Sequence, residues 1–541
     1  MGAVVREWWV VRFLFSGLVA LLGLCVLSSC AIAPAGLERR EVFGGTGGSY
    51  EREDLGVLLM EALADPESAE GAHALGHFVE TWKRERENAQ AGIVTVTGAD
   101  GKVTKRYEVR FVSDHAPGYT LDYFDEISPA VDYEVKKISH HRRAGYGAPL
   151  VALRENRGQE AIEAYFPPEA ITRPLTAVVE TTPTAGDRPQ QVEIRLLCPL
   201  RHDTVSHHGK QVPVAADFSV PWAGLLSRTG ELNRQKLTDA FNRNPEREPN
   251  LYLLEPYDPT KEPLIMVHGL FSTPLTWANL SNELWADDEI RNRYQIWHYL
   301  YNTSAPALYS GRILQQQLKE LRQILDPSGT DPAMQRTTII AHSMGGIVSR
   351  RMITRPKNVF WDAAFTQSFE SLKLSEEDRA ALQEAFFWEP EGHIKRMIYV
   401  AVPHRGSDYA DNFFGQLGRV LVKPPDRFSA FYERISAANP GAFTEAYAAL
   451  GRGELDSVGA LSPKQPTLQI LAELPNSHSV VEHSVIGDRG RGGALEESSD
   501  GIVPYWSSHL ERARSERIVA SGHSAVDDEG TVLEVKRVLK L

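Results

Sequence analysis

Ser343 lies where an apolar run meets a segment of helical composition, a position that can make a serine hydroxyl reactive. The run TTIIA leads into His342 and Ser343, and MGGIVSRRMI follows. A tight turn at such a junction lifts the hydroxyl above the edge of a sheet, and the start of the next helix offers backbone N–H groups to a developing oxyanion. Ala341 stands where this turn usually has its first glycine. Because alanine adds only one methyl group, we expect the turn to form.

A serine hydroxyl is a weak nucleophile, so it needs a histidine as base and a carboxylate that orients the histidine. His523 follows the last apolar run, ERIVAS, and precedes the closing helical segment. Two aspartates compete for the role of acid, because Asp488 ends the run HSVIGD and Asp500 lies in SSDGIVP. Three further histidines are less well placed, since none follows the final run: His478, His483 and His509. The order serine, acid, histidine predicts nucleophilic acyl chemistry.

The elements that must position these residues alternate between strands and helices after Pro263. Six short apolar runs indicate strands: PLIMVHG, YQIWHYLY, TTIIAHS, IKRMIYVAVP, HSVIGD and ERIVAS. Between them, YSGRILQQQLKELRQIL repeats leucine at helical spacing. This alternation predicts an α/β fold with a mostly parallel sheet and helices on its faces. Each candidate residue falls at the carboxyl end of a predicted strand, where reactive groups of such sheets lie.

The preceding part of the chain, residues 30–250, has a different pattern. Helical segments come first, followed by the strand pairs around ADG at 99–101 and around TPTAGDRPQ. We therefore expect a separate accessory domain that is α+β or mainly β, and we expect the cluster HHRR at 140–143 to be a solvated loop. Five prolines between 245 and 263 mark the domain boundary, and LYLLEP within them could be an edge strand of the second domain, 251–541.

Residues 1–29 read as a leader. Arg6 and Arg12 precede FLFSGLVALLGLCVL, which suits a signal-peptide core and is short for a bilayer span. The next residues, LSSC, resemble a bacterial lipobox, which implies that Cys30 becomes a lipidated N-terminus. The residue after the lipidated cysteine is Ala31 rather than aspartate, and by the enterobacterial sorting pattern this favours the outer membrane of the cell envelope. The alternative is an uncleaved anchor helix that begins near Trp8.

Charge and cysteine content limit the classes of partner. The chain has 541 residues and a formal net charge of −13, with basic residues scattered along it, so no nucleic-acid partner is expected. Of three cysteines, one leaves with the leader and Cys30 would be acylated. Cys198 then remains alone, and an intramolecular disulfide is excluded.

Residues from about 251 to 541 resemble an α/β hydrolase of the lipase/esterase group, similar to triacylglycerol lipases and to GPI-inositol-deacylase-like enzymes. The resemblance is carried by A-x-S-x-G around Ser343 and by SDGIVP, VHGLF at 267–271 and VPHRGS at 402–407. It implies that Asp500 rather than Asp488 is the acid, because SDGIVP resembles the acid loop of these enzymes.

The same resemblance implies an oxyanion hole made by the backbone N–H groups of Leu270 and Met344, with Phe271 a less favoured alternative to Leu270. His268 in that motif is expected to be structural. His404 and Arg405 in VPHRGS are expected to brace a loop, with no catalytic role.

Two long insertions, at about 356–393 and 408–475, interrupt the minimal fold and carry aromatic residues: Phe413, Phe414, Phe428, Phe431 and Tyr432. Aromatic residues at helical spacing are more often core than ligand contacts. Our hypothesis is nonetheless that the insertions form a helical cap over Ser343 that shapes an acyl pocket.

Together these features predict an envelope-anchored serine hydrolase of carboxylic esters, with an acyl ester or lipid as substrate and the membrane bound through Cys30. Ser343, His523 and Asp500 would form and hydrolyse an acyl-enzyme, and no metal or organic cofactor is expected. Two alternatives remain open. One is an acyltransferase that uses the same triad, and the other is a non-catalytic envelope binding protein built on a hydrolase scaffold.

Overall fold

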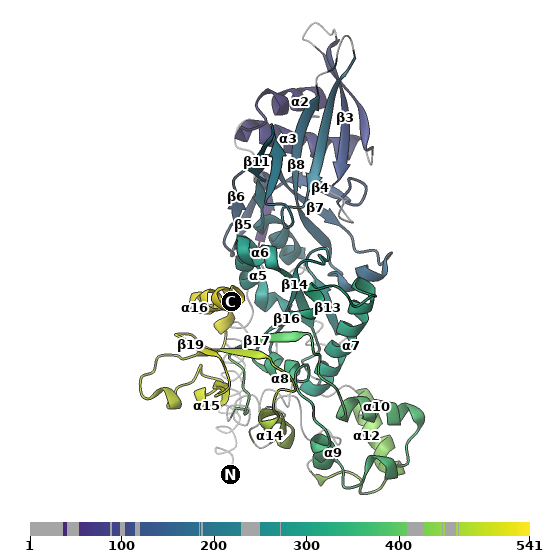
Figure 1. Cartoon of the computed structure of the whole chain (residues 1–541), viewed down its shortest axis with the longest axis vertical. Helices are drawn as coiled ribbons and strands as arrows, with labels where there is room; N and C mark the ends of the chain where they lie inside the picture. The colour runs from purple at the N-terminus through teal and green to yellow at the C-terminus, as the bar shows by residue number, and fades with distance from the viewer. Residues whose placement is uncertain are drawn as a thin grey trace, which may run out of the picture.

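The computed structural model describes residues 36–39 and most of residues 54–541 (Figure 1). The residues outside the description are 1–35, 40–53, 87–88, 98–102, 114–118, 183, 185–187, 229–248, 271, 304, 408–425, 446, 449–460, 462 and 464. The predicted leader and Cys30 are among them. Within the described part of the chain, no helix combines the length and the apolar character needed to cross a membrane.

The C-terminal part is built on a seven-stranded sheet with the order β13-β15-β14-β16-β17-β18-β19. All neighbouring strands are parallel except β13, which pairs antiparallel with β15 at one edge. The strands are β13 (Asn250–Leu253), β14 (Glu262–Val267), β15 (Tyr294–Leu300), β16 (Thr337–His342), β17 (Ile394–Val400), β18 (Val481–Gly487) and β19 (Ser515–Val519). The predicted α/β fold, its six strands and the LYLLEP edge strand are confirmed.

Helices cover both faces of this sheet (Figure 1). They are α5 (Ala278–Ala286), α6 (Asp288–Arg293), α7 (Ala307–Leu325), α8 (Met344–Arg350), α14 (Pro466–Glu473), α15 (Tyr505–Ser508) and α16 (Glu529–Leu539). Side chains of β14 alternate between the faces, since Leu264 and Met266 join one apolar cluster while Ile265 and Val267 join the other. A strand buried on both faces reads as a continuous apolar run, which is why these strands are visible in the sequence.

The N-terminal part is an α+β domain around a six-stranded mixed sheet with the order β2-β3-β9-β8-β7-β4. The predicted hairpins correspond to the antiparallel pairs β2–β3 and β8–β9, and β3 also pairs parallel with β9. Helix α2 (Leu55–Ala64) and helix α3 (Ala69–Glu85) contribute to the core of this sheet. The sheet strands are β2 (Ala91–Thr97), β3 (Val103–Ser113), β4 (Glu126–Pro129), β7 (Ala148–Arg154), β8 (Ile171–Thr182) and β9 (Gln190–Leu197).

Three two-stranded pairs complete this domain. They are β1 (Gly36–Arg39) with β5 (Tyr133–Lys136), β6 (Arg142–Arg143) with β12 (Ala216–Asp217), and β10 (Thr204–His207) with β11 (Lys210–Pro213).

The two parts of the chain are joined by buried contacts around α5. One apolar cluster contains residues of both sheets. The indole N–H of Trp222 donates to the carbonyl of Ala278 (2.8 Å), and the side-chain amide of Asn282 donates to the carbonyl of Ser139 (2.8 Å). Lys261 is almost fully buried, and its ammonium group donates to a carbonyl of the N-terminal domain. The N-terminal domain is therefore packed onto the second sheet.

The prediction that the cluster HHRR at 140–143 is a solvated loop is wrong. Arg142 and its neighbour form β6, and His140 and Arg142 both contact the buried carboxylate of Asp217, at 2.7 and 3.0 Å. His141 reaches across to Glu283 of α5 at 2.8 Å. These charges are paired with distant segments, and the contact of His141 with Glu283 helps to join the two domains.

The described parts of the two insertions pack against each other as a helical subdomain of α9 (Val359–Ala364), α10 (Glu376–Phe386) and α12 (Asp426–Ala438). Its small apolar core is separate from the two large clusters and contains Trp361, Ala364, Phe365, Leu372, Leu382, Ile435 and Ala442. Figure 1 places these helices together at one end of the molecule, next to α14.

Candidate active site

Ser343 occupies a strained turn between β16 and α8. Its φ and ψ angles are 52° and −128°, a left-handed backbone that non-glycine residues rarely adopt. Its N–H donates to the carbonyl of Val400 at the end of β17 (3.0 Å), and its own carbonyl accepts from the N–H of Gly346 (3.0 Å). The neighbouring strand and the helix thus hold the serine in this conformation above the sheet edge.

The structure brings the three predicted triad side chains into one hydrogen-bonded chain. His523 Nε2 lies 2.8 Å from Ser343 Oγ, and His523 Nδ1 lies 2.8 Å from Asp500 Oδ2. Ser343 follows β16, Asp500 lies in the loop after β18 and His523 follows β19, so the three residues come from the carboxyl ends of three parallel strands. With the proton on Nδ1, the imidazole donates to the carboxylate and can accept the serine proton at Nε2.

Asp500 is held as a carboxylate. It is almost fully buried, and burial by itself would raise the pKa of the carboxyl group. The contact with His523 and the backbone N–H groups of Ile502 (2.8 Å) and Val503 (2.7 Å), which donate to Oδ1, outweigh this effect and lower the pKa below its ordinary value. Both carboxylate oxygens are thus occupied, which fixes the orientation that the histidine requires.

Two glycines allow the loop after β14 to approach the serine. A Cβ atom on Gly269 would lie 2.9 Å from Ser343 Cβ, and a Cβ atom on Gly345 would lie 2.3 Å from the carbonyl oxygen of Val267. Leu270 follows Gly269 directly, and Met344 is the first residue of α8, where backbone N–H groups lack a partner inside the helix. Both expected oxyanion donors therefore lie in segments adjacent to the serine, whereas Phe271 is outside the described residues.

Comparison with known proteins bears on the fold of this part of the chain. Residues 258–366 match the family model described as "PGAP1-like alpha/beta domain", and this stretch contains β14, β16 and Ser343. The C-terminal domain has the α/β-hydrolase fold. No curated protein matches the chain.

Several solved structures are weakly similar to part of this chain. The mature form of the Bacillus licheniformis lipase BlEst2 is 17% identical, over 54% of this chain and 97% of that chain, with a TM-score of 0.32. Staphylococcus hyicus lipase is 14% identical over 55% of this chain and 95% of that chain, with a TM-score of 0.32. Lipase 1 from Pelosinus fermentans is 12% identical over 52% of this chain and 98% of that chain, also with a TM-score of 0.32. At these TM-scores the likeness is too weak to support an inference.

The competing aspartate and the three competing histidines of the sequence analysis are engaged elsewhere. Asp488 accepts from the N–H of Gly490 (2.9 Å). The remaining histidines bond as follows: His478 to the carbonyl of Ile394, His483 to Ser515 and His509 to Glu516. The triad geometry therefore favours Asp500 and His523 over all four.

Two buried histidines beside the serine are neutral. His268 stacks on Tyr301 with ring centroids 4.4 Å apart, and burial lowers its pKa to about 4. His342 precedes the serine, and its Nε2–H donates to the carbonyl of His523 (2.8 Å). Burial, together with the neighbouring His523, lowers the pKa of His342 to about 3. His268 is placed as a structural residue, and the bond from His342 to the base loop is a feature that the sequence did not reveal.

The VPHRGS loop braces the acid loop, as expected. The guanidinium of Arg405 donates to the carbonyls of Trp506 (2.8 Å) and His509 (2.7 Å). Ser407 Oγ donates to the carbonyl of Ile502, the residue whose N–H binds the Asp500 carboxylate. His404 is buried and burial lowers its pKa well below the ordinary value. This loop thus helps to fix the position of the Asp500 carboxylate through Ile502.

The second insertion leaves and rejoins the hydrolase domain next to the site. The N–H of Ser407 donates to the carbonyl of Leu461 (3.0 Å), so a later part of the insertion returns to the residue that precedes its start, beside the acid loop. Phe431 packs on the core of the helical subdomain, and Tyr432 lies 4.9 Å from another aromatic ring of it. Phe413 and Phe414, and the side chain of Phe428, lie outside the description. The cap over Ser343 stays a prediction.

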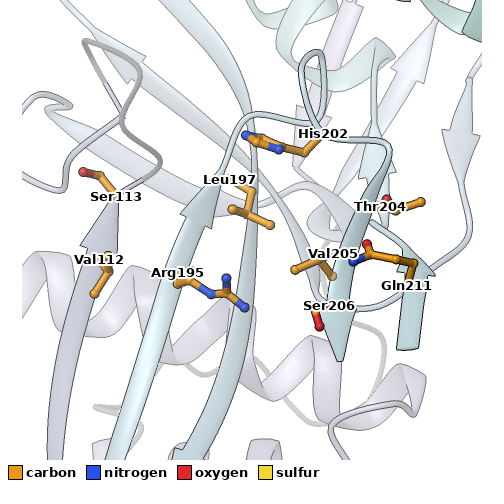
Figure 2. Close-up of a pocket in the computed structure, with 9 residues that line it drawn as sticks. All are labelled: Val112, Ser113, Arg195, Leu197, His202, Thr204, Val205, Ser206 and Gln211. Atoms are coloured by element: carbon orange, nitrogen blue, oxygen red, sulfur yellow. The ribbon is translucent and has the colours of Figure 1, made fainter. Parts of the chain in front are cut away.

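A cavity of about 350 Å³ lies in the N-terminal domain, away from the candidate triad (Figure 2). It is formed between the ends of β3 and β9 and the β10–β11 pair, and its walls include Ser113, Arg195, His202, Thr204 and Gln211. The Arg195 guanidinium is paired with Glu180, so the cavity offers no unneutralised arginine to an anionic ligand.

Proposed function

We propose that this chain is a serine hydrolase that cleaves carboxylic esters through an acyl-enzyme. The observation that carries the proposal is the hydrogen-bonded series Ser343–His523–Asp500, with two contacts of 2.8 Å and a serine at positive φ. Such a series is the arrangement that activates a serine hydroxyl. Backbone strain of this kind persists only where the surrounding structure imposes it, and such residues cluster at active sites.

In the acylation step, Ser343 Oγ attacks the ester carbonyl carbon while its proton passes to His523 Nε2. The resulting imidazolium is stabilised by Asp500, which stays ionised because its lowered pKa lies far below that of a free imidazole. The carbonyl oxygen becomes an oxyanion, and the N–H groups of Leu270 and Met344 would bind it. The intermediate then collapses, the bond to the leaving oxygen breaks, and Nε2–H gives its proton to the departing alcohol.

In the deacylation step, water takes the place of the alcohol. His523 Nε2 accepts a proton from this water as its oxygen attacks the acyl carbon, and the carboxylic acid leaves when the bond to Ser343 Oγ breaks. Oγ recovers its proton from Nε2, so the triad returns to its starting state. These residues account for every proton transfer in the cycle.

The substrate class and the location belong to the same proposal. An acyl ester or lipid fits an enzyme held at the cell envelope through a lipidated Cys30, because the substrate would then lie in or near the membrane surface that carries the enzyme. The predicted cap of residues 356–393 and 408–475 would select the acyl chain.

The test is active-site labelling of the full-length protein with a fluorophosphonate probe, followed by a panel of 4-nitrophenyl esters of graded acyl length. The wild type should be labelled, and Ser343→Ala should lose labelling together with at least about 10⁴ of kcat. A matched control is Ser349→Ala, because Ser349 lies further along α8 and donates to the Gly345 carbonyl instead. A folded wild type without Ser343-dependent labelling would refute the proposal, and acyl products formed only with an added acceptor alcohol would favour acyl transfer.

A further inference from the structure

Two histidines and an aspartate gather on the N-terminal domain, away from the candidate triad. His73 and His77 are four residues apart on α3, so both point to the same face of the helix. Asp132 ends the short helix 130–132 that links β4 to β5 and packs beside this face. One possible ligand atom from each residue lies within 4.8 Å of the other two.

The spacing of one pair of these atoms matches what a tetrahedral metal ion requires. His77 Nε2 and Asp132 Oδ1 are 3.5 Å apart, which is too long for a strong hydrogen bond. Two ligands about 2.1 Å from a tetrahedral Zn²⁺ are separated by about 3.4 Å, so an ion fits between this nitrogen and this oxygen without backbone movement. His73 is exposed, its ring lies 4.4 Å from that of His77, and one of its nitrogens lies within 4.8 Å of the other two ligand atoms.

A fourth residue lies on the side where a metal-binding histidine usually has its outer partner, although it must move closer to form a hydrogen bond. Glu80 Oε2 lies 3.6 Å from His77 Nδ1, the ring nitrogen that faces away from Asp132. Its other oxygen accepts from the hydroxyl of Ser128 in β4 (2.8 Å). A carboxylate behind a ligating histidine fixes the ring and its tautomer and increases its affinity for the metal.

We propose that His73, His77 and Asp132 bind a divalent transition-metal ion, of which Zn²⁺ is the best match. Two imidazoles and one carboxylate favour zinc over magnesium and calcium, which prefer sites made of oxygen ligands. Water completes the coordination. The ion ties α3 to the segment that leads into β5, and β5 pairs with β1, the described strand that lies nearest to the N-terminus. The site therefore secures the part of the domain through which the chain enters the fold.

A second group, Glu67, His207 and His208, also has ligand atoms within 4.8 Å of one another. His207 is stacked on Tyr146 with ring centroids 3.9 Å apart, and its Nε2 lies 3.2 Å from Glu67. This group has no carboxylate placed behind a histidine among the described contacts. It serves as the matched control, because His208 is an exposed histidine like His73.

The experiment uses full-length protein in detergent, stripped with a chelator and titrated with ZnCl₂ in a calorimeter. The expected result is one equivalent of Zn²⁺ bound per chain and a rise in Tm, since zinc at 100 times Kd shifts the folding equilibrium about 100-fold. His73→Gln should weaken zinc binding at least tenfold and remove the rise, whereas His208→Gln should leave both unchanged. Glu80→Gln should weaken binding by about 10- to 100-fold while keeping the stoichiometry.

Three results of the zinc titrations would overturn the proposal. One is a wild type that binds no zinc at 100 µM. Another is zinc binding that survives His73→Gln, and the third is binding that is lost in His208→Gln. MgCl₂ titrated under the same conditions should give no heat of binding, and binding of magnesium as tight as that of zinc would also contradict the assigned ligands.

Discussion

Replacing Gly345 by alanine should separate the two halves of the proposed oxyanion hole. The new Cβ would lie 2.3 Å from the carbonyl oxygen of Val267 and 2.5 Å from that of His268, whereas ordinary contacts begin near 3.4 Å. Because the obstacle is strand backbone, α8 must move away from β14 by about 1 Å. A displacement of this size in a catalytic arrangement costs about 10²-fold in rate, and the overpacking costs about 1–3 kcal/mol of stability.

The assay is kcat/KM on a short 4-nitrophenyl ester, with Tm and the rate of fluorophosphonate labelling measured on the same samples. We expect Gly345→Ala to lose about 10²-fold in kcat/KM, mostly in kcat, while it remains folded. Gly392→Ala is the matched control, since a Cβ at Gly392 meets no atom within 4 Å. If Gly345→Ala kept kcat/KM within threefold of the wild type, or if the control lost as much, the argument from close approach would be refuted.

Three further predictions concern the site and its surroundings. Ala341→Gly should keep kcat/KM within a few-fold, while Ala341→Leu should lower both activity and Tm, because the Ala341 side chain is fully buried against the α8 side of the sheet; equal activity of the two variants would contradict this. Asp500→Asn should reduce kcat by about 10⁴ with little change in Tm, because the histidine loses its orienting carboxylate, and Asp488→Asn should not. His393 directly precedes β17 and is buried, and burial lowers its pKa to about 3. Its stabilising contribution is therefore present above about pH 6.5 and is lost as the pH falls toward 3. Urea unfolding at pH 7 and pH 5 should therefore show a smaller loss of stability for His393→Phe than for the wild type, and an equal loss would count against the assignment.

Much of the hydrolase fold could be predicted because its strands are buried on both faces and therefore stand out as apolar runs. The same property located Ser343 and His523, since each follows such a run directly. Asp500 lies further from its strand than Asp488 does, and it was chosen because SDGIVP resembles the acid loop of lipases and esterases. The mutual distances of the three residues could not be predicted, because these depend on the order of strands in the sheet. The bond from His342 to the base loop joins residues 181 positions apart, and no local pattern signals it.

The N-terminal domain was harder to predict for a related reason. Its hairpins are local and were visible, but the parallel pairing of β3 with β9 joins distant segments. The cluster of two histidines and two arginines looked like a solvated loop because its partners are far away in sequence. Asp217 and Glu283 lie between 75 and 142 residues from the residues that they bind. A cluster of charged residues looks exposed in the sequence because the distant residues that pair with it cannot be seen there.

The continuous apolar cluster around α5 has a consequence for how the molecule loses its structure. Residues of both sheets contribute to it, and buried hydrogen bonds such as those of Trp222 and Asn282 cross the same region. Neither half can melt without exposing the core of the other, so the two sheets should unfold in one cooperative transition. A fragment that begins at residue 251 would expose the outer face of α5 to solvent, and the hydrolase half would then tend to aggregate.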